Sequence, residues 1–221
     1  MRRRRRARES IDTEWASCPE VLEALQHFVN NRELAGNEPL PPRVAVTSTT
    51  AGEGVSTVAS GLAAVLAAEF DTTVVLVDLS WLGRAARPGS MPIEPGIRDV
   101  VHLEAQLDDV LVDTADRNVL RLGEGLGDTN LIAPRSQDLD DILDELSNSF
   151  DHVLLDMPPV LEGSAGLPLF RLADAYVLVV RSGVTRADQV ARATRQLAEV
   201  PLAGSVLNRL RSRVPAALQR D

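Results

Sequence analysis

The chain has 221 residues, 44% of them apolar, which is enough to bury one substantial core. The formal net charge is −9, but six of the 23 basic residues lie within residues 1–8, so the remainder has 17 basic against 32 acidic residues, a net of −15. An acidic body repels nucleic-acid phosphates. The single cysteine, Cys18, rules out a disulfide framework. No apolar run reaches the roughly 20 residues that span a bilayer. We therefore expect a cytoplasmic protein whose folded part binds no nucleic acid.

The N-terminal arginine run predicts a basic, disordered tail over residues 1–18, whose charge would suit anionic lipid or an acidic partner. A helix is predicted over Pro19–Leu34, where Pro19 occupies a tolerated first-turn position. Its apolar residues follow helical spacing: Val21, Leu22, Leu25, Phe28 and Val29. We expect residues 19–221 to form a single domain.

After a Gly- and Pro-containing break at residues 35–42, apolar runs alternate with amphipathic segments. Strands are predicted at Val44–Val46, Val74–Val77, Val153–Leu155, Tyr176–Val180 and Ser205–Leu207. Helices are predicted at about Val55–Phe70, Leu139–Asn148 and Arg186–Glu199. Continuous apolar strands separated by helices indicate an α/β fold, a three-layer sandwich around a mostly parallel sheet.

The pattern is weaker between Leu79 and Asp138. Two short helices are predicted there, at Ile97–Val101 and Leu107–Val112. Two short strands are predicted at Val119–Leu122 and Asn130–Ile132.

The loop that joins the first strand to its helix has the features of a phosphate-binding loop. Backbone N–H groups at such a junction converge on one point, and the helix dipole adds positive potential there. The candidate nucleotide-binding residues are Gly52, Glu53, Gly54, Val55, Ser56 and Thr57. The strict P-loop pattern has Gly at the position of Thr49 and Lys at the position of Val55, so an ordinary Gly-containing turn remains an alternative.

Two acidic residues end predicted strands: Asp78 follows Val74–Val77, and Asp156 follows Val153–Leu155. Carboxyl ends of parallel strands meet at one edge of a sheet, the edge that also carries the loop. With the Ser56 hydroxyl, the two carboxylates make a plausible magnesium shell, although a helix cap or a surface turn is the alternative for either alone.

These residues together resemble the ATPase domain of bacterial tyrosine kinases that govern capsule and exopolysaccharide export. That family is a branch of the deviant P-loop group, which also holds the partition and cell-division ATPases. Its members read roughly SSxPGEGKST at the loop, then an apolar strand with DxDxR, then an apolar strand with DxPP. The counterparts here are Ser48–Thr57, Asp78–Leu82 and Asp156–Pro159.

Two further segments are similar to the family, and the resemblance covers nearly the whole chain. Gly96–Val100 is similar to the family's GLSDVL segment, and Val206–Asn208 to its closing VLN. The asparagine lies near the adenine in relatives, which implies a nucleotide contact for Asn208. The implied cofactors are ATP and magnesium.

The sequence departs from the family at several positions. The family's lysine is replaced by Val55. All 23 basic residues of the chain are arginine, but valine, unlike arginine, does not keep the charge of a lysine. The second motif has Ser80 for its second Asp and Leu82 for its Arg. The family's ExxRxxR assembly pattern reduces here to Glu23 followed by Gln26 and Val29, and the family's tyrosine-rich tail has no counterpart, because the only tyrosine is Tyr176.

The resemblance, together with the missing family residues, predicts a degenerate kinase-like protein. It would bind ATP weakly, hydrolyse little or none of it, and regulate or scaffold capsular or exopolysaccharide synthesis and export. The implied partner is a membrane-embedded chain-length-control protein that would recruit it to the inner face of the membrane, with a homo-oligomer also possible. One alternative is an active ATPase or tyrosine kinase that uses an unconventional cation, supplied by Arg84 or Arg87 or in trans by a partner. Others are a partition or cell-division ATPase relative and an adaptor that binds no nucleotide.

Overall fold

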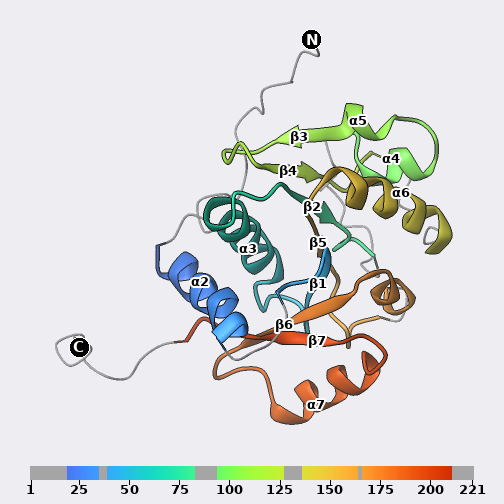
Figure 1. The fold of residues 1–221 in the computed structure, drawn as a ribbon. Coiled ribbons are helices and arrows are strands. Elements are labelled where there is room, and N and C mark those ends of the chain that lie inside the picture. The colour runs from blue at the N-terminus through green and yellow to red at the C-terminus, as the bar shows by residue number, and fades with distance from the viewer. Residues whose placement is uncertain (1–18, 35–38, 83–93, 127–135, 164–165, 211–221) are drawn as a thin grey trace.

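The computed structural model describes residues 19–34, 39–82, 94–126, 136–163 and 166–210. The expectations for the basic tail, for Arg84 and Arg87 and for a strand at Asn130–Ile132 lie outside these residues. The elements follow the predicted alternation, and all of the strands that the structure describes belong to one sheet in the order β3-β4-β2-β5-β1-β6-β7 (Figure 1).

The strands are β1 (Arg43–Ser48), β2 (Val74–Asp78), β3 (Leu111–Asp113), β4 (Val119–Leu122), β5 (His152–Asp156), β6 (Ala175–Arg181) and β7 (Leu202–Asn208). All neighbours pair in parallel except β3 and β4, which are antiparallel. The helices are α2 (Pro19–Leu34), α3 (Val55–Glu69), α4 (Ile97–Val101), α5 (Leu107–Val110), α6 (Ser136–Ser149) and α7 (Ala187–Gln196), with a 3-10 helix η1 (Leu167–Leu172). The α/β class and the mostly parallel sheet are therefore confirmed.

The sheet separates two hydrophobic clusters, one on each face. Helices α2 and α3 cover one face, and α4, α5, α6, η1 and α7 cover the other (Figure 1). Successive strand residues alternate between the clusters, because side chains along a strand point to opposite faces. In β2, for example, Val74 and Leu76 face α3, whereas Val75 and Val77 face α6.

Helix α6 illustrates why these segments are helical. Its sequence places Leu139, Ile142, Leu143 and Leu146 at i, i+3, i+4 and i+7, and all four are buried against the sheet. Acidic residues occupy the exposed face. The guanidinium of Arg43, at the start of β1, bridges two of them, pairing with Asp140 at 3.1 Å and with Asp144.

The structure differs from the predictions in two places. The helix expected over Leu107–Val112 ends at Val110, and Leu111–Asp113 forms strand β3, because these residues pair with β4 in the register Leu111 with Leu122. A single helical turn is too short for periodicity to separate it from a strand. The 3-10 helix η1 is likewise not predicted from the sequence pattern, although its Phe170 is buried in the core.

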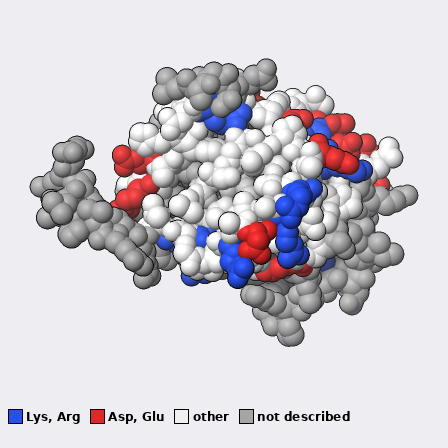
Figure 2. Space-filling view, turned by 90° about the horizontal axis from the view of Figure 1, so that it is seen from below, with Lys and Arg blue, Asp and Glu red and all other residues white. Residues whose placement is uncertain are grey.

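Figure 2 shows the molecule from below the view of Figure 1, with basic and acidic groups lying next to one another among uncharged atoms. Exposed ion pairs such as Arg171 with Glu199, at 2.6 Å, and Arg186 with Asp188, at 2.8 Å, are of this kind. Interspersed charges of both signs produce no strong field of one sign over a surface.

Candidate nucleotide-binding site

The loop between β1 and α3 turns through two glycines with left-handed backbone. Gly52 has φ 79° and Gly54 has φ 101°, values that residues with a Cβ adopt only with strain. A Cβ on Gly54 would also collide with the amide nitrogen of Asn208. The sequence thus forms this tight strand-to-helix turn with glycine at the two positions where the backbone requires it.

Glu53 holds the loop from inside. Its carboxylate is 2% exposed and accepts hydrogen bonds from the amide of Thr49 at 2.8 Å and from the Thr49 hydroxyl at 3.0 Å. The Thr185 hydroxyl, in the turn before α7, also donates to it. A buried carboxylate needs such donors, and here they tie the loop to a neighbouring turn across the sheet edge.

The first turn of α3 carries amide groups that the helix itself does not use. Its first helical bond runs from Val58 N–H to the carbonyl of Gly54, so the amides of residues 54–57 have no acceptor within the helix. No side chain caps this end, and the first turn contains no acidic residue. These amides and the helix dipole therefore favour an anion at this position, such as a phosphate group.

Asn208, for which the resemblance implies a nucleotide contact, lies at the carboxyl end of β7. Its side-chain amide donates to the carbonyl of Glu53 at 2.8 Å. Asn208 thus braces the turn that precedes α3, and it closes the site on the β6–β7 side.

Asp78 and Asp156 lie side by side at the carboxyl edge of the sheet. They are register partners in the parallel pair β2–β5, and Asp156 also lies opposite Val46 of β1, two residues before that strand ends. Leu76 and Leu154, two residues before each aspartate, belong to the cluster under α3. Both carboxylates consequently lie on the face where α3 begins, as the sequence predicts.

The carboxylate of Asp78, one of the three residues predicted to hold magnesium, has partners within the fold on both of its oxygens. One of its carboxylate oxygens accepts hydrogen bonds from the Ser80 amide at 3.1 Å and hydroxyl at 2.7 Å. The other lies 3.3 Å from the guanidinium of Arg121 on β4. Within the described ranges, no three acidic, histidine or cysteine side chains form a metal-binding group.

Two contacts of this site were missed by the sequence analysis. Arg121 sits in the short strand VLRL, and only the pairing of β4 with β2 brings it to Asp78. Glu162, in the loop after β5, accepts a hydrogen bond from the backbone amide of Ala51 at 2.7 Å. The charged residue inside an apolar strand was the available signal for Arg121, whereas nothing local marks Glu162.

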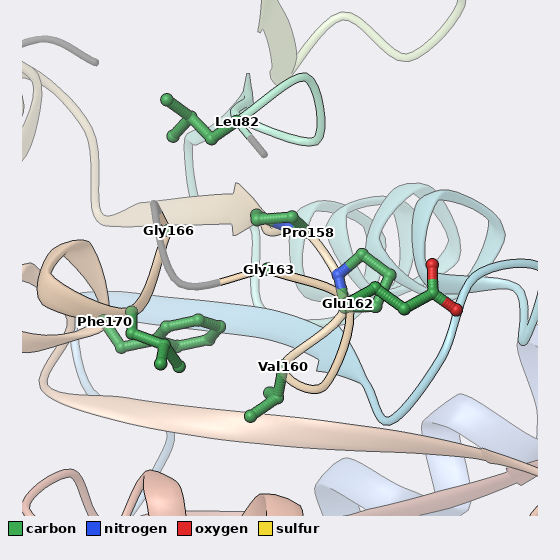
Figure 3. A pocket seen from close by; sticks show the side chains of 9 residues that line it. Leu82, Pro158, Val160, Glu162, Gly163, Gly166 and Phe170 are labelled. Carbon is green, nitrogen blue, oxygen red and sulfur yellow. The ribbon is translucent and has the colours of Figure 1, made fainter. Parts of the chain in front are cut away.

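A small cavity of about 30 Å³ lies beside the site, between Leu82, Pro158 and Phe170 (Figure 3). Its volume matches about one water molecule, and Leu82 and Phe170 belong to the cluster under α6, so a nucleotide does not fit there. Figure 3 shows the Glu162 side chain extending away from Phe170. The amides that favour an anion lie instead at the start of α3.

No described helix combines the length and the apolar character that a bilayer crossing requires.

Comparisons with known proteins agree with the fold. No family model matches the chain. The tyrosine-protein kinase YwqD of Bacillus subtilis (strain 168) is 28% identical over 183 residues, which cover 80% of this chain and 76% of YwqD. The kinase domain of the Escherichia coli tyrosine kinase ETK superposes with a TM-score of 0.73 at 20% identity and covers 95% of this chain and 86% of that domain.

A cell-division protein has a similar fold. The septum site-determining protein MinD of Pyrococcus horikoshii, complexed with Mg-ADP, has a TM-score of 0.60 at 22% identity, covering 80% of this chain and 75% of MinD. The chain therefore has the α/β fold of the P-loop ATPases. In sequence and fold it is similar to the ATPase domain of bacterial tyrosine kinases.

Proposed function

We propose that this chain is a nucleotide-binding member of the bacterial tyrosine kinase group that turns ATP over slowly or not at all. We propose further that it regulates or scaffolds capsular or exopolysaccharide synthesis and export. The observation that carries the proposal is the loop itself. The amides at the start of α3 have no acceptor within the helix, two aspartates end neighbouring strands at the same sheet edge, and the position of the family's lysine holds the uncharged Val55.

The absence of the family's lysine reduces ATP affinity less than it reduces the rate of phosphoryl transfer. A lysine that reaches the phosphates makes charge-assisted hydrogen bonds worth about 1.5–3 kcal/mol each, so its absence weakens ATP binding by roughly tenfold to a hundredfold. Phosphoryl transfer depends on charges that stabilise the transition state, and losing one such group typically costs on the order of a hundredfold to a thousandfold in rate. The amide-lined loop therefore supports binding without efficient turnover.

The tyrosine content supports the same proposal. The only tyrosine in the sequence, Tyr176, lies on β6 with 2% of its surface exposed, and burial raises the pKa of its phenol. A buried phenol in a central strand cannot reach a phosphate without unfolding of the sheet. Autophosphorylation of the kind implied by the resemblance therefore has no accessible acceptor in this sequence.

The cellular role rests on the similarity to kinases of this group. We propose a cytoplasmic location and a membrane-embedded partner of the polysaccharide chain-length-control type, which would bring the chain to the inner face of the membrane. The assembly pattern on α2 is reduced, with Glu23 exposed and Val29 buried, so a homo-oligomer would need other contacts.

An active enzyme of the same group is the second candidate, and one observation favours it. Arg121 brings a guanidinium to the edge that carries both aspartates, and a guanidinium can take over part of the charge of a lost lysine.

The two candidates are separated by calorimetric titration with ATP, paired with a phosphate-release assay. The proposed function predicts weak ATP binding, negligible phosphate release, and a gain in affinity of roughly tenfold or more in Val55→Lys. Asp156→Ala is the matched control for any turnover that is observed. The proposed function is contradicted if the wild type releases phosphate at rates ordinary for ATPases of this fold, if that release vanishes in Asp156→Ala, and if Val55→Lys does not change the affinity for ATP.

A further inference from the structure

We propose that Arg181, at the carboxyl end of β6, supplies a positive charge to the phosphates of a nucleotide bound at the β1–α3 loop. This inference deepens the proposed function and rests on it. It places the cation on the side of the loop away from the two aspartates, because β6 and β5 flank β1 on opposite sides. It also assigns the polyphosphate chain as the part of the ligand that Arg181 contacts.

The sheet places Arg181 next to the loop. Strand β6 pairs directly with β1, and Val179 lies opposite Ser48, the last residue of β1. Arg181 follows two residues later, at the level of the loop itself. Val177 and Val179 pack in the cluster under α3, so the alternation of side chains puts Arg181 on the face where α3 begins. Val55, at the position of the family's lysine, packs against the same cluster.

Two hydrogen bonds connect the Arg181 backbone to the loop. Its amide donates to the Thr185 hydroxyl at 3.0 Å, and that hydroxyl donates to the Glu53 carboxylate. The Arg181 nitrogen therefore lies within about 6 Å, two hydrogen-bond lengths, of the Glu53 carboxylate. An extended arginine side chain is roughly 7 Å long at ordinary bond lengths. The guanidinium can thus reach the residues on either side of Glu53, where the amides that open α3 begin.

Asn208 shows how closely this face approaches the start of α3. It is the register partner of Arg181 on β7, and Val206, two residues earlier, packs against the cluster under α3. Asn208 and Arg181 therefore share a face. The side-chain amide of Asn208 donates to the Glu53 carbonyl at 2.8 Å. Because β6 lies between β7 and β1, Arg181 starts one strand nearer to the loop and has the longer side chain.

The guanidinium of Arg181 is available to an anion. Arg181 is partly buried, and within the part of the chain that the structure describes its guanidinium has no ion-pair or hydrogen-bond partner. By contrast, Arg121 at the same edge is paired with Asp78. A guanidinium presents a planar fork of donors that matches two phosphate oxygens. Together with the amides at the start of α3, it favours a polyphosphate at the loop.

The test is titration of the full chain with ATP and with inorganic tripolyphosphate, which lacks the base and the sugar. Arg181→Gln keeps a polar side chain but loses the charge, so it should weaken binding of both ligands by about tenfold or more. Arg181→Lys keeps the charge and should recover most of the affinity. Arg195→Gln is the matched control, because Arg195 is exposed in the last turn of α7, and it should leave both Kd values unchanged.

Three results overturn the inference alone. The first is an unchanged affinity for ATP in Arg181→Gln. The second is a loss of ATP affinity without a loss for tripolyphosphate, since Arg181 would then contact the base or the sugar. The third is an Arg181→Lys variant that binds no better than Arg181→Gln, since the charge would then not be what the ligand requires. Wild-type protein that does not bind ATP overturns the proposed function as well.

Discussion

Gly54 shows how much a single residue decides in this loop. It combines a left-handed φ of 101° with a side chain, Asn208, placed directly where a Cβ would stand. Gly52 has a left-handed φ as well, but nothing lies within 4 Å of the Cβ position. The two glycines therefore separate the cost of backbone strain from the cost of a collision.

We expect Gly54→Ala to destabilise the fold more than Gly52→Ala. Strain alone costs about 1–2 kcal/mol at either position, and the displaced Asn208 adds at least about 1 kcal/mol at Gly54, because its bond to Glu53 is lost. Urea unfolding of the two variants measures the difference. Equal midpoints and slopes would show that Asn208 moves aside without cost.

Glu162 places a negative charge on a loop that we propose binds an anion. Its carboxylate accepts a hydrogen bond from the backbone amide of Ala51 at 2.7 Å. We expect Glu162→Gln, which retains an oxygen acceptor but loses the charge, to tighten ATP binding by roughly threefold, more at low salt.

Titrations at two salt concentrations check this, with Glu145→Gln as the control, since Glu145 is exposed on the outer surface of α6. Weaker ATP binding in Glu162→Gln would mean that the carboxylate organises the loop instead of opposing the ligand.

At the scale of elements, the β1–α3 loop depends on the turn between β6 and α7. Glu53 joins them, since its carboxylate accepts bonds both from Thr49 within the loop and from Thr185 in the turn. The local sequence pattern predicts the loop, but it does not predict the contact with Thr185, which lies 132 residues from Glu53 in the chain.

We expect Glu53→Ala to cost about 2–3 kcal/mol of stability, because it leaves the buried Thr49 amide and hydroxyl without their acceptor. Thr185→Val, which removes one donor and keeps the carboxylate, should cost about 1 kcal/mol. Thermal or urea unfolding gives both values. A reversed order would show that the turn, and not the loop, is the element that Glu53 stabilises.

At the scale of the whole molecule, stability should depend on pH through His152 at the opposite edge of the sheet. Burial lowers the pKa of His152 below its ordinary value of 6.5, although the Pro41 carbonyl and Asp151 raise it in part. As pH falls below about 6.5, the unfolded chain takes up a proton that the folded chain resists, so the free energy of unfolding decreases.

His152→Gln should therefore flatten the decline in stability between pH 7 and pH 5, whereas the exposed His102→Gln should not. Urea unfolding across this range is the measurement, and identical slopes for wild type and His152→Gln would contradict it. Asp151 acts in a separate window: hydrogen bonds from Thr73 lower its pKa, so its contribution is present above about 3.8 and is lost as pH falls through the folded value.

Three features can be predicted from the amino-acid sequence: the alternation of strands and helices, the glycine turn after β1 and the aspartates that end β2 and β5. Each follows from residues close together in the chain, where apolar periodicity and strand-end position are sufficient signals. Strand β3, among the short elements between residues 97 and 122, cannot be predicted from its own sequence, because it exists only through its antiparallel pairing with β4.

Which of these residues come into contact depends on the strand pairing in the folded chain. The strand order sets Asp78 beside Asp156 and Arg121 beside Asp78, and it brings Glu162 onto Ala51. These contacts join residues 43 to 111 positions apart, and they depend on which strands pair and in which register. No local pattern carries that information, because a strand's own sequence fixes its faces but not its neighbours.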